Sequence, residues 1–335
     1  MAVRETRGLV PVLAALGGNI GVLIIKALVA SASGSSAMFA EAIHSAADTL
    51  NQALLLIGIR RSRRKADEEF HYGYGPERFF WALISACGIF FIGACVSVYR
   101  GVMALLYPQY IELTAYAFLV LAVSFVIEFW TFRIATRALV RAHPTLSWWE
   151  RLDYADPTTL AVCLEDGIAV IGVVVAAIAI FASYITSNPT WDAGGSIAVG
   201  LLLAGAAVIL IMKNRMYLIG RSIPEDVREG IIEFLNKEPV IERVLDFKSS
   251  VIDVDVWRIK CEVEFNGSAL LYEARQQKNI EAEWEDVQGD HEAFKRFVVS
   301  FAGRIPRLIG KKIDQIEGKL KKRYPQIQHI DIEIN

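Results

Sequence analysis

The residues with the clearest capacity for chemistry lie in two apolar stretches of this 335-residue chain. The first stretch contains His44 and Asp48, which are four residues apart and therefore share one helix face, with Cβ atoms about 5–6 Å apart. Imidazole nitrogen and carboxylate oxygen are ordinary Zn²⁺ ligands at about 2.0–2.2 Å. An aspartate alone costs about 2.5–3.5 kcal/mol at the centre of a bilayer. A bound dication would offset that cost, so the pair predicts half of a metal site.

The second stretch, AVCLEDGIAVIGV, contains Glu165 and Asp166. Tetrahedral zinc takes four ligands, which two facing helices can supply. Adjacent side chains point about 100° apart around a helix. Both carboxylates can therefore bind one ion only if the helix has an irregular turn or one side chain extends far from its usual direction. We predict that His44, Asp48 and Asp166 bind the ion. Glu165 and a water molecule are the alternatives for the fourth position.

Each of these side chains also has an ordinary structural interpretation. A single histidine inside a membrane often packs with a hydrogen bond, and a single carboxylate often pairs with a neighbouring helix. Glu128, in VSFVIEFW, favours such a structural role, with a proton carrier as an alternative. Lys26 and Asn19 are candidates to pair with the carboxylates. Glu41 precedes His44 by about one turn and is a candidate to line an access path.

Six apolar segments are long enough to cross a bilayer, which takes roughly 20 residues. They cover residues 8–31, 35–59, 79–107, 113–140, 158–185 and 191–219. Arginine and lysine gather in the connection 60–78 and around the connection between spans four and five. The connections near Ser33, Gln109 and Ser187 contain neither. The positive-inside rule therefore predicts that both termini and both basic connections are cytosolic.

The chain changes character near residue 222. Apolar residues make up 54% of the whole sequence, but the long apolar runs end there. We therefore predict a six-helix transmembrane transport domain at 1–221 and a cytosolic α+β domain at 222–335. In the latter, Ser222 is a candidate cap for a first helix, and an alternating strand at 257–265 is predicted to pair with 244–252.

The rest of the tail completes a small domain. A polar insertion at about 266–305 precedes an amphipathic helix at 309–320 and a last strand at 330–334. The order αββ, insertion, αβ suits an open sheet with helices on one face.

Several function classes find no support in the sequence. There is no glycine-rich phosphate loop, so ATP-driven pumping is not predicted. The run RRSRRK is interpreted as a topology signal and as a contact with anionic lipid, not with nucleic acid. A membrane enzyme would need a general base and a substrate cleft, for which the sequence gives no separate sign.

Residues beyond the two ligand pairs carry a resemblance to a known family. The runs AEAIHSAADTLNQALL and DPTTLAVCLEDGIAVIG, together with Asp67, the pair Tyr72-Gly73, Asp192 and the closing QHIDIEI, resemble the cation diffusion facilitators. Within that family the chain is most similar to the zinc transporter nine branch. The resemblance covers nearly the whole chain.

This resemblance implies a homodimer that exchanges metal for protons by alternating access, with metal bound between spans two and five. It also implies a ferredoxin-like cytosolic domain that helps to dimerise. By position, His44, Asp48 and Asp166 match the transport-site ligands. Val162 stands where the family often has His or Asp, with Glu165 as a possible substitute, and His71 lies one place late in FHYG.

Together, these observations predict a secondary active transporter of a divalent metal, with Zn²⁺ as the transported substrate and protons as the counter-ion. Mn²⁺, Fe²⁺ and Co²⁺ are alternative cargoes, because a His/carboxylate site suits each of them. A non-transporting membrane receptor or scaffold is the alternative of another class. The short N-terminus favours a bacterial inner membrane.

Overall fold

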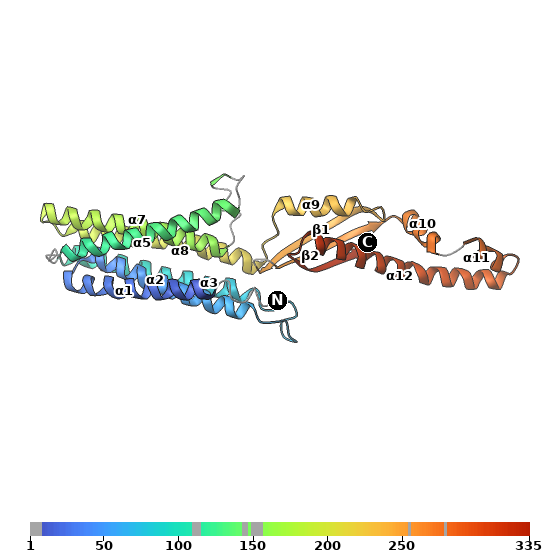
Figure 1. The fold of residues 1–335 in the computed structure, drawn as a ribbon, viewed down its shortest axis with the longest axis horizontal. Helices are drawn as coiled ribbons and strands as arrows, with labels where there is room; N and C mark the ends of the chain where they lie inside the picture. Colours follow the sequence, from blue (N-terminus) through green and yellow to red (C-terminus); the bar gives the residue numbers. More distant parts are fainter. Residues whose placement is uncertain (1–8, 109–114, 143–146, 149–156, 254–255, 278–279) are drawn as a thin grey trace. The chain divides into compact units, whose positions relative to one another are not determined.

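The computed structural model describes residues 9–108, 115–142, 147–148, 157–253, 256–277 and 280–335. The chain divides into two compact units, Met1–Ile219 and Gly220–Asn335 (Figure 1). In the described residues the first unit is helical, and the second contains both helices and strands.

Helices lie at all six predicted spans of the first unit. They are α1 (Leu9–Ser33), α2 (Ser36–Ser62), the continuous run of α3 (Glu77–Gly88), the π-helix η2 (Ile89–Ala94) and α4 (Cys95–Leu106), then α5 (Ala115–Ala142), α7 (Pro157–Thr186) and α8 (Thr190–Ile219). Within the described ranges, four stretches are long and apolar enough to cross a membrane: Glu77–Leu106, Phe118–Arg137, Val162–Thr186 and Thr190–Ile219. The predicted helices are thus confirmed, whereas six crossings remain a prediction. Gln109 and much of the connection between α5 and α7 lie outside the described residues.

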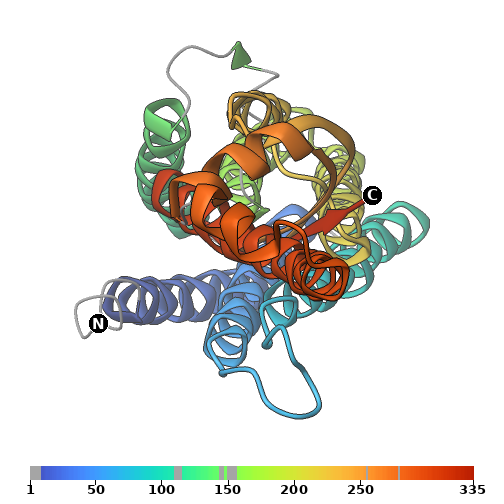
Figure 2. The ribbon, with the colours of Figure 1, turned by 90° about the vertical axis from the view of Figure 1, so that its right-hand side faces the viewer.

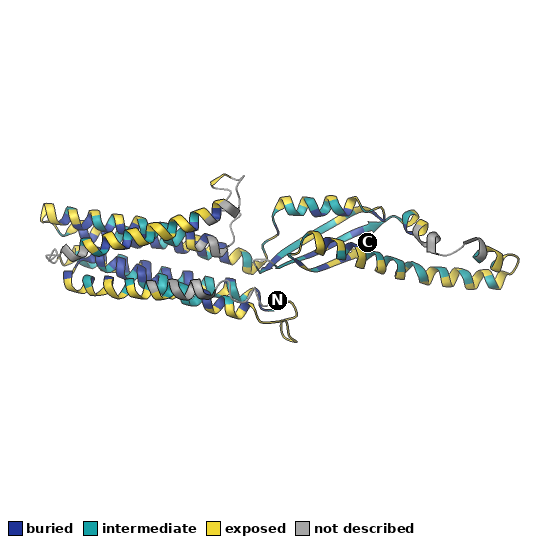
Figure 3. Ribbon diagram, viewed as in Figure 1, coloured by how far each residue is buried: buried dark blue, intermediate teal, exposed yellow. Residues whose placement is uncertain are grey.

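Small side chains bring these helices together. Figure 2 shows the helices of the first unit nearly end-on and side by side. Helix α2 contacts α1, α3, α7 and α8. Ala40 and Ala47 of α2 and Ala207 of α8 belong to one buried cluster. Large apolar side chains such as Leu28 and Phe91 are instead about two-thirds exposed, at 67% and 66%, and exposed residues recur along each helix (Figure 3). An outer surface this apolar indicates a lipid environment.

The second unit is built on a three-stranded sheet in the order β1-β2-β3. Its elements are α9 (Glu225–Asn236), β1 (Ile241–Asp253), β2 (Val256–Phe265), α10 (Gly267–Gln277), α11 (Ile280–Val287), α12 (His291–Arg323) and β3 (Ile327–Ile334). The predicted hairpin is confirmed, because β1 and β2 pair antiparallel. β3 runs parallel to β2, and a parallel pair needs a long crossover, which α10 to α12 supply. A ferredoxin-like fold remains a prediction.

Two details of the predicted tail are wrong. Ser222 does not cap the first helix, because α9 begins at Glu225 after Pro224, and no side chain caps it. The helix predicted at 309–320 begins much earlier, at His291, where the Asp290 side chain accepts hydrogen bonds from the first amides. Pro306 lies inside this helix. The latter part of the predicted insertion is therefore a continuous helical extension of α12.

Candidate metal site

His44 is a buried side chain with free ligand atoms. Only 1% of its surface is exposed, and neither ring nitrogen has a hydrogen-bond partner among the described residues. Its Nε2 lies 3.6 Å from Asp48 Oδ2, which is too long for a hydrogen bond. Buried polar atoms normally have a partner, so an imidazole left open beside a carboxylate suits a metal ion. The predicted helix-face pair is therefore present in α2.

Glu165, from α7, is directed towards α2. It accepts a hydrogen bond from Asn51 Nδ2, and Asn51 Oδ1 in turn accepts one from Ser85 Oγ of α3 at 2.5 Å. The other carboxylate oxygen of Glu165 is buried and has no described partner. Asn51 was not among the predicted site residues. Its position seven residues after His44, on the same helix face, was the available signal.

Asp166, also from α7, turns towards another helix. It lies near the Thr131 side chain of α5, whose hydroxyl donates a hydrogen bond to the Glu128 carbonyl oxygen at 2.9 Å. The divergence of Glu165 and Asp166 follows the angle expected for adjacent helical residues. Gly167 follows them, but α7 continues without interruption from Pro157 to Thr186.

The four predicted ligands are near one another but do not surround one point. The carboxylates of Glu165 and Asp166 each lie close enough to Asp48 to repel it. In the part of the chain that the structure describes, no three His, Cys, Asp or Glu side chains are close enough to hold one ion. Carboxylates without a cation between them repel strongly at low dielectric, which opposes closer approach.

A buried ion-pair triad lies beside these residues. Lys26 Nζ is 3.1 Å from Glu41 Oε2 and 2.8 Å from Glu128 Oε1, so one ammonium joins α1, α2 and α5. The predicted pairing of Lys26 with carboxylates is confirmed, and Glu128 is one of its two partners. Glu41, the candidate for an access path, is instead fully buried in this triad. A Cβ at Gly172 of α7 would lie 2.8 Å from Glu41 Oε1, so glycine makes room for that carboxylate.

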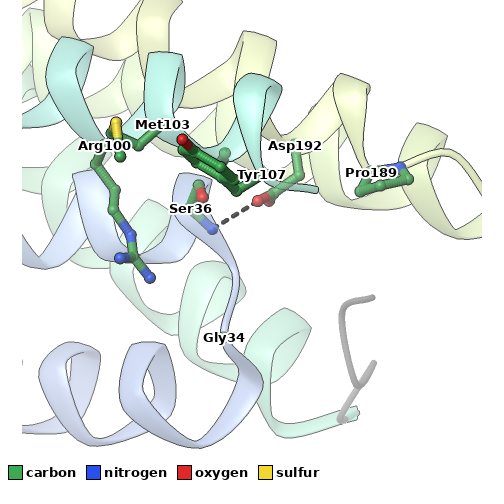
Figure 4. A pocket seen from close by; sticks show the side chains of 8 residues that line it. Gly34, Ser36, Arg100, Met103, Tyr107, Pro189 and Asp192 are labelled. Carbon is green, nitrogen blue, oxygen red and sulfur yellow. Dashed lines mark hydrogen bonds between the residues drawn. The ribbon is translucent and has the colours of Figure 1, made fainter. Parts of the chain in front are cut away.

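The start of α2 is held by Asp192, from the first turn of α8. The Ser35 hydroxyl donates to Asp192 Oδ1 at 2.6 Å. The Ser36 amide donates to Asp192 Oδ2 at 2.5 Å, as Figure 4 shows. The Ala37 amide adds a further bond at 3.2 Å. A carboxylate suits this place because the first amides of a helix lack partners and carry partial positive charge. His44 follows about two turns later.

The connection after α2 contains the other residues noted in the sequence. Asp67 accepts hydrogen bonds from the Tyr74 hydroxyl at 2.6 Å and from the amides of Glu69 and Phe70. These bonds, the one from Tyr74 foremost, hold the pKa of the Asp67 carboxyl below its usual value. His71 is exposed. Asp67 therefore organises a turn.

Comparisons with known proteins agree with a transport fold. A family model described as the cation efflux transmembrane domain matches residues 12–219. The "Proton-coupled zinc antiporter SLC30A9, mitochondrial" of Homo sapiens is 36% identical over 306 residues, which cover 90% of this chain and 54% of that protein. The chain thus spans about half the length of that relative.

Two further relatives are covered over more of their length. The "Metal tolerance protein C4" of Arabidopsis thaliana is 36% identical over 332 residues, which cover 95% of this chain and 72% of that protein. The "Magnetosome protein MamB" of a Magnetospira strain is 25% identical over 278 residues, which cover 82% of this chain and 90% of that protein.

Proposed function

The chain belongs to the cation efflux family, and we propose that it exchanges Zn²⁺ for protons across a membrane, without ATP. Its helical unit makes it a multi-pass membrane protein. The name of the human relative, a proton-coupled zinc antiporter, supports both the cargo and the counter-ion.

One observation carries the proposal: the open, buried imidazole of His44 beside Asp48 in α2. Zn²⁺ would take a ring nitrogen and a carboxylate oxygen from this pair, with Asp166 and Glu165 as ligands from α7. The cation would cancel the repulsion that keeps the carboxylates apart, so closure of α7 on α2 would accompany binding.

Proton coupling follows from the ligand chemistry. Zinc binds neutral imidazole and ionised carboxylates, so loading the site releases protons. Protons that arrive from the opposite side compete for the same atoms and displace the metal. If the site faces each side in turn, this competition couples the two fluxes.

The proposal includes the finer architecture that the sequence predicts. The helices of residues 1–221 would cross the membrane six times, and residues 222–335 would form a ferredoxin-like cytosolic domain. Arg60, Arg63 and Lys65 are exposed at the end of α2, which supports a cytosolic position for that end. Both termini would then be cytosolic.

The proposal also covers the membrane in which the chain lies and its assembly. A bacterial membrane is proposed from the MamB relative, which comes from a Magnetospira strain, whereas the human relative is named mitochondrial. A homodimer is proposed from the family resemblance. Locating the chain in its source cells and measuring its mass in detergent test these two points.

Flux measurements on the full chain in proteoliposomes test the function. We expect external Zn²⁺ to enter and protons to leave, as reported by metal and pH dyes inside the vesicles. A His44→Ala, Asp48→Ala double variant should lose both fluxes. His71→Ala, a change of an exposed histidine outside the helices, should keep them. Equal Zn²⁺ uptake by the double variant and the unaltered protein would refute the site. Competition by Mn²⁺, Fe²⁺ and Co²⁺ in the same assay ranks the alternative cargoes.

A further inference from the structure

A small cavity lies between α1, α2 and α5, next to the candidate metal site. Its lining is Asn19 and Val22 from α1, Ser45 and Asp48 from α2, and Ser124, Ile127 and Glu128 from α5. Five of these seven side chains carry an oxygen atom, and none is a histidine or cysteine. The volume of about 30 Å³ exceeds the roughly 10–15 Å³ that one water-sized particle needs. It is too small for a metal ion with its hydration shell.

One carboxylate oxygen in this lining is left without a partner among the described residues. Glu128 uses Oε1 for Lys26, but its Oε2 is buried and has no partner among the described residues. Ser124, whose side chain lines the same cavity, is only 2% exposed. Since buried polar atoms in native proteins nearly always have a partner, a bound particle is expected here.

The charges around the cavity favour a cation. Lys26 is the ammonium of the triad, and it is shared by Glu41 and Glu128. Asp48 adds a third carboxyl group from the cavity wall. When all of them are ionised, three carboxylates are opposed by one ammonium, and the remaining charge of −2 is what a divalent cation balances.

We propose that this cavity is a second cation subsite with oxygen ligands alone, which shares Asp48 with the His44–Asp48 pair. Carboxylate, hydroxyl and amide oxygens are the ligands of hard cations such as Mg²⁺, Ca²⁺ and Mn²⁺, whereas imidazole favours Zn²⁺. The all-oxygen ligand set is inferred from the residues that line the cavity. Its use as a staging position for cargo, passed through Asp48, rests on the proposed transport function.

Mn²⁺ is the probe for this subsite, because it is paramagnetic and prefers oxygen ligands. Pulsed electron paramagnetic resonance on the full chain in micelles separates Mn²⁺ coupled to an imidazole nitrogen from Mn²⁺ without that coupling. We expect a nitrogen-free population that Ser124→Val abolishes, because the change removes an oxygen and puts a methyl group in the cavity. Ser183→Val, at a buried serine of α7 outside the cavity lining, should keep it. His44→Gln should also keep it.

The outcomes separate the subsite from the transport function. A nitrogen-free signal of equal size in Ser124→Val and the unaltered protein would overturn the subsite, since that Mn²⁺ would lie on the acidic surface. Nitrogen coupling on all bound Mn²⁺ would overturn it too. If Ser124→Val fails to fold, Asn19→Leu replaces it and must lose the same signal. Failure of Zn²⁺ flux in the unaltered protein contradicts the proposed function alone.

Discussion

Replacing Lys26 by methionine tests the buried triad, because it removes the ammonium and keeps most of the side-chain length. Lys26 and Glu41 are both fully buried, with their charged atoms 3.1 Å apart. At an effective dielectric constant of about 20, a contact near 3 Å corresponds to roughly 5 kcal/mol of Coulomb attraction before desolvation. Removing one partner of a buried pair typically costs about 3–5 kcal/mol. We expect a loss of that size in the free energy of unfolding.

The double variant Lys26→Met, Glu41→Gln is the matched control. Lys26→Met strands the carboxylates of Glu41 and Glu128, and the second change removes the charge of the fully buried one, so the double variant should be more stable than Lys26→Met alone. Thermal unfolding in detergent measures both, and for about 200 residues each kcal/mol corresponds to roughly 2–4 °C in Tm. A Lys26→Met protein within about 0.5 kcal/mol of the unaltered one would refute the reasoning, as would a double variant that is the less stable of the two.

Three further predictions concern the supports of the site. Asp192→Ala leaves buried amides at the start of α2 without acceptors, so unfolding should need about 1–3 kcal/mol less, and an unchanged Tm would contradict the cap. Gly101→Ala puts a Cβ 2.6 Å from an α8 side chain and should cost about 1–3 kcal/mol in thermal unfolding. Gly205→Ala, which has open space, should be neutral or stabilising by up to about 1 kcal/mol. The pKa of Asp67 is lower in the folded protein than in the unfolded chain, chiefly because of the hydrogen bond from Tyr74. Asp67 therefore stabilises the turn fully at a pH above its unfolded pKa. This stabilisation is lost as the pH falls through the folded pKa. Amide protection factors in this turn should therefore drop in acid, and a drop of equal size in Asp67→Ala would exclude that carboxyl as the cause.

Features set by local pattern could be predicted from the sequence. The alternation in β2 predicted which side chains are buried, and Ile259, Cys261 and Val263 are at most 1% exposed. The i, i+4 spacing of His44 and Asp48 placed their side chains together because helix geometry alone decides it. The apolar runs predicted helices for the same reason.

Features set by which helices become neighbours could not be predicted in this way. Asn51 meets Glu165 across 114 positions of sequence, and Asp192 caps a helix that begins 156 positions earlier. No local pattern encodes such partners. Asp290 is a good N-cap residue, so the start of α12 could have been predicted from the sequence. Pro306 argued against a continuous helix there, because proline usually ends or kinks a helix.

X-ray absorption at the zinc edge, on the full chain loaded with one Zn²⁺ per protomer, tests the central claim most directly. The account predicts an imidazole scattering signature together with oxygen ligands at about 2.0–2.2 Å. His44→Gln should remove that signature, because the other four of the five histidines lie elsewhere in the chain. An imidazole signature of undiminished strength in the His44→Gln protein would show that zinc binds at another histidine and would contradict the account.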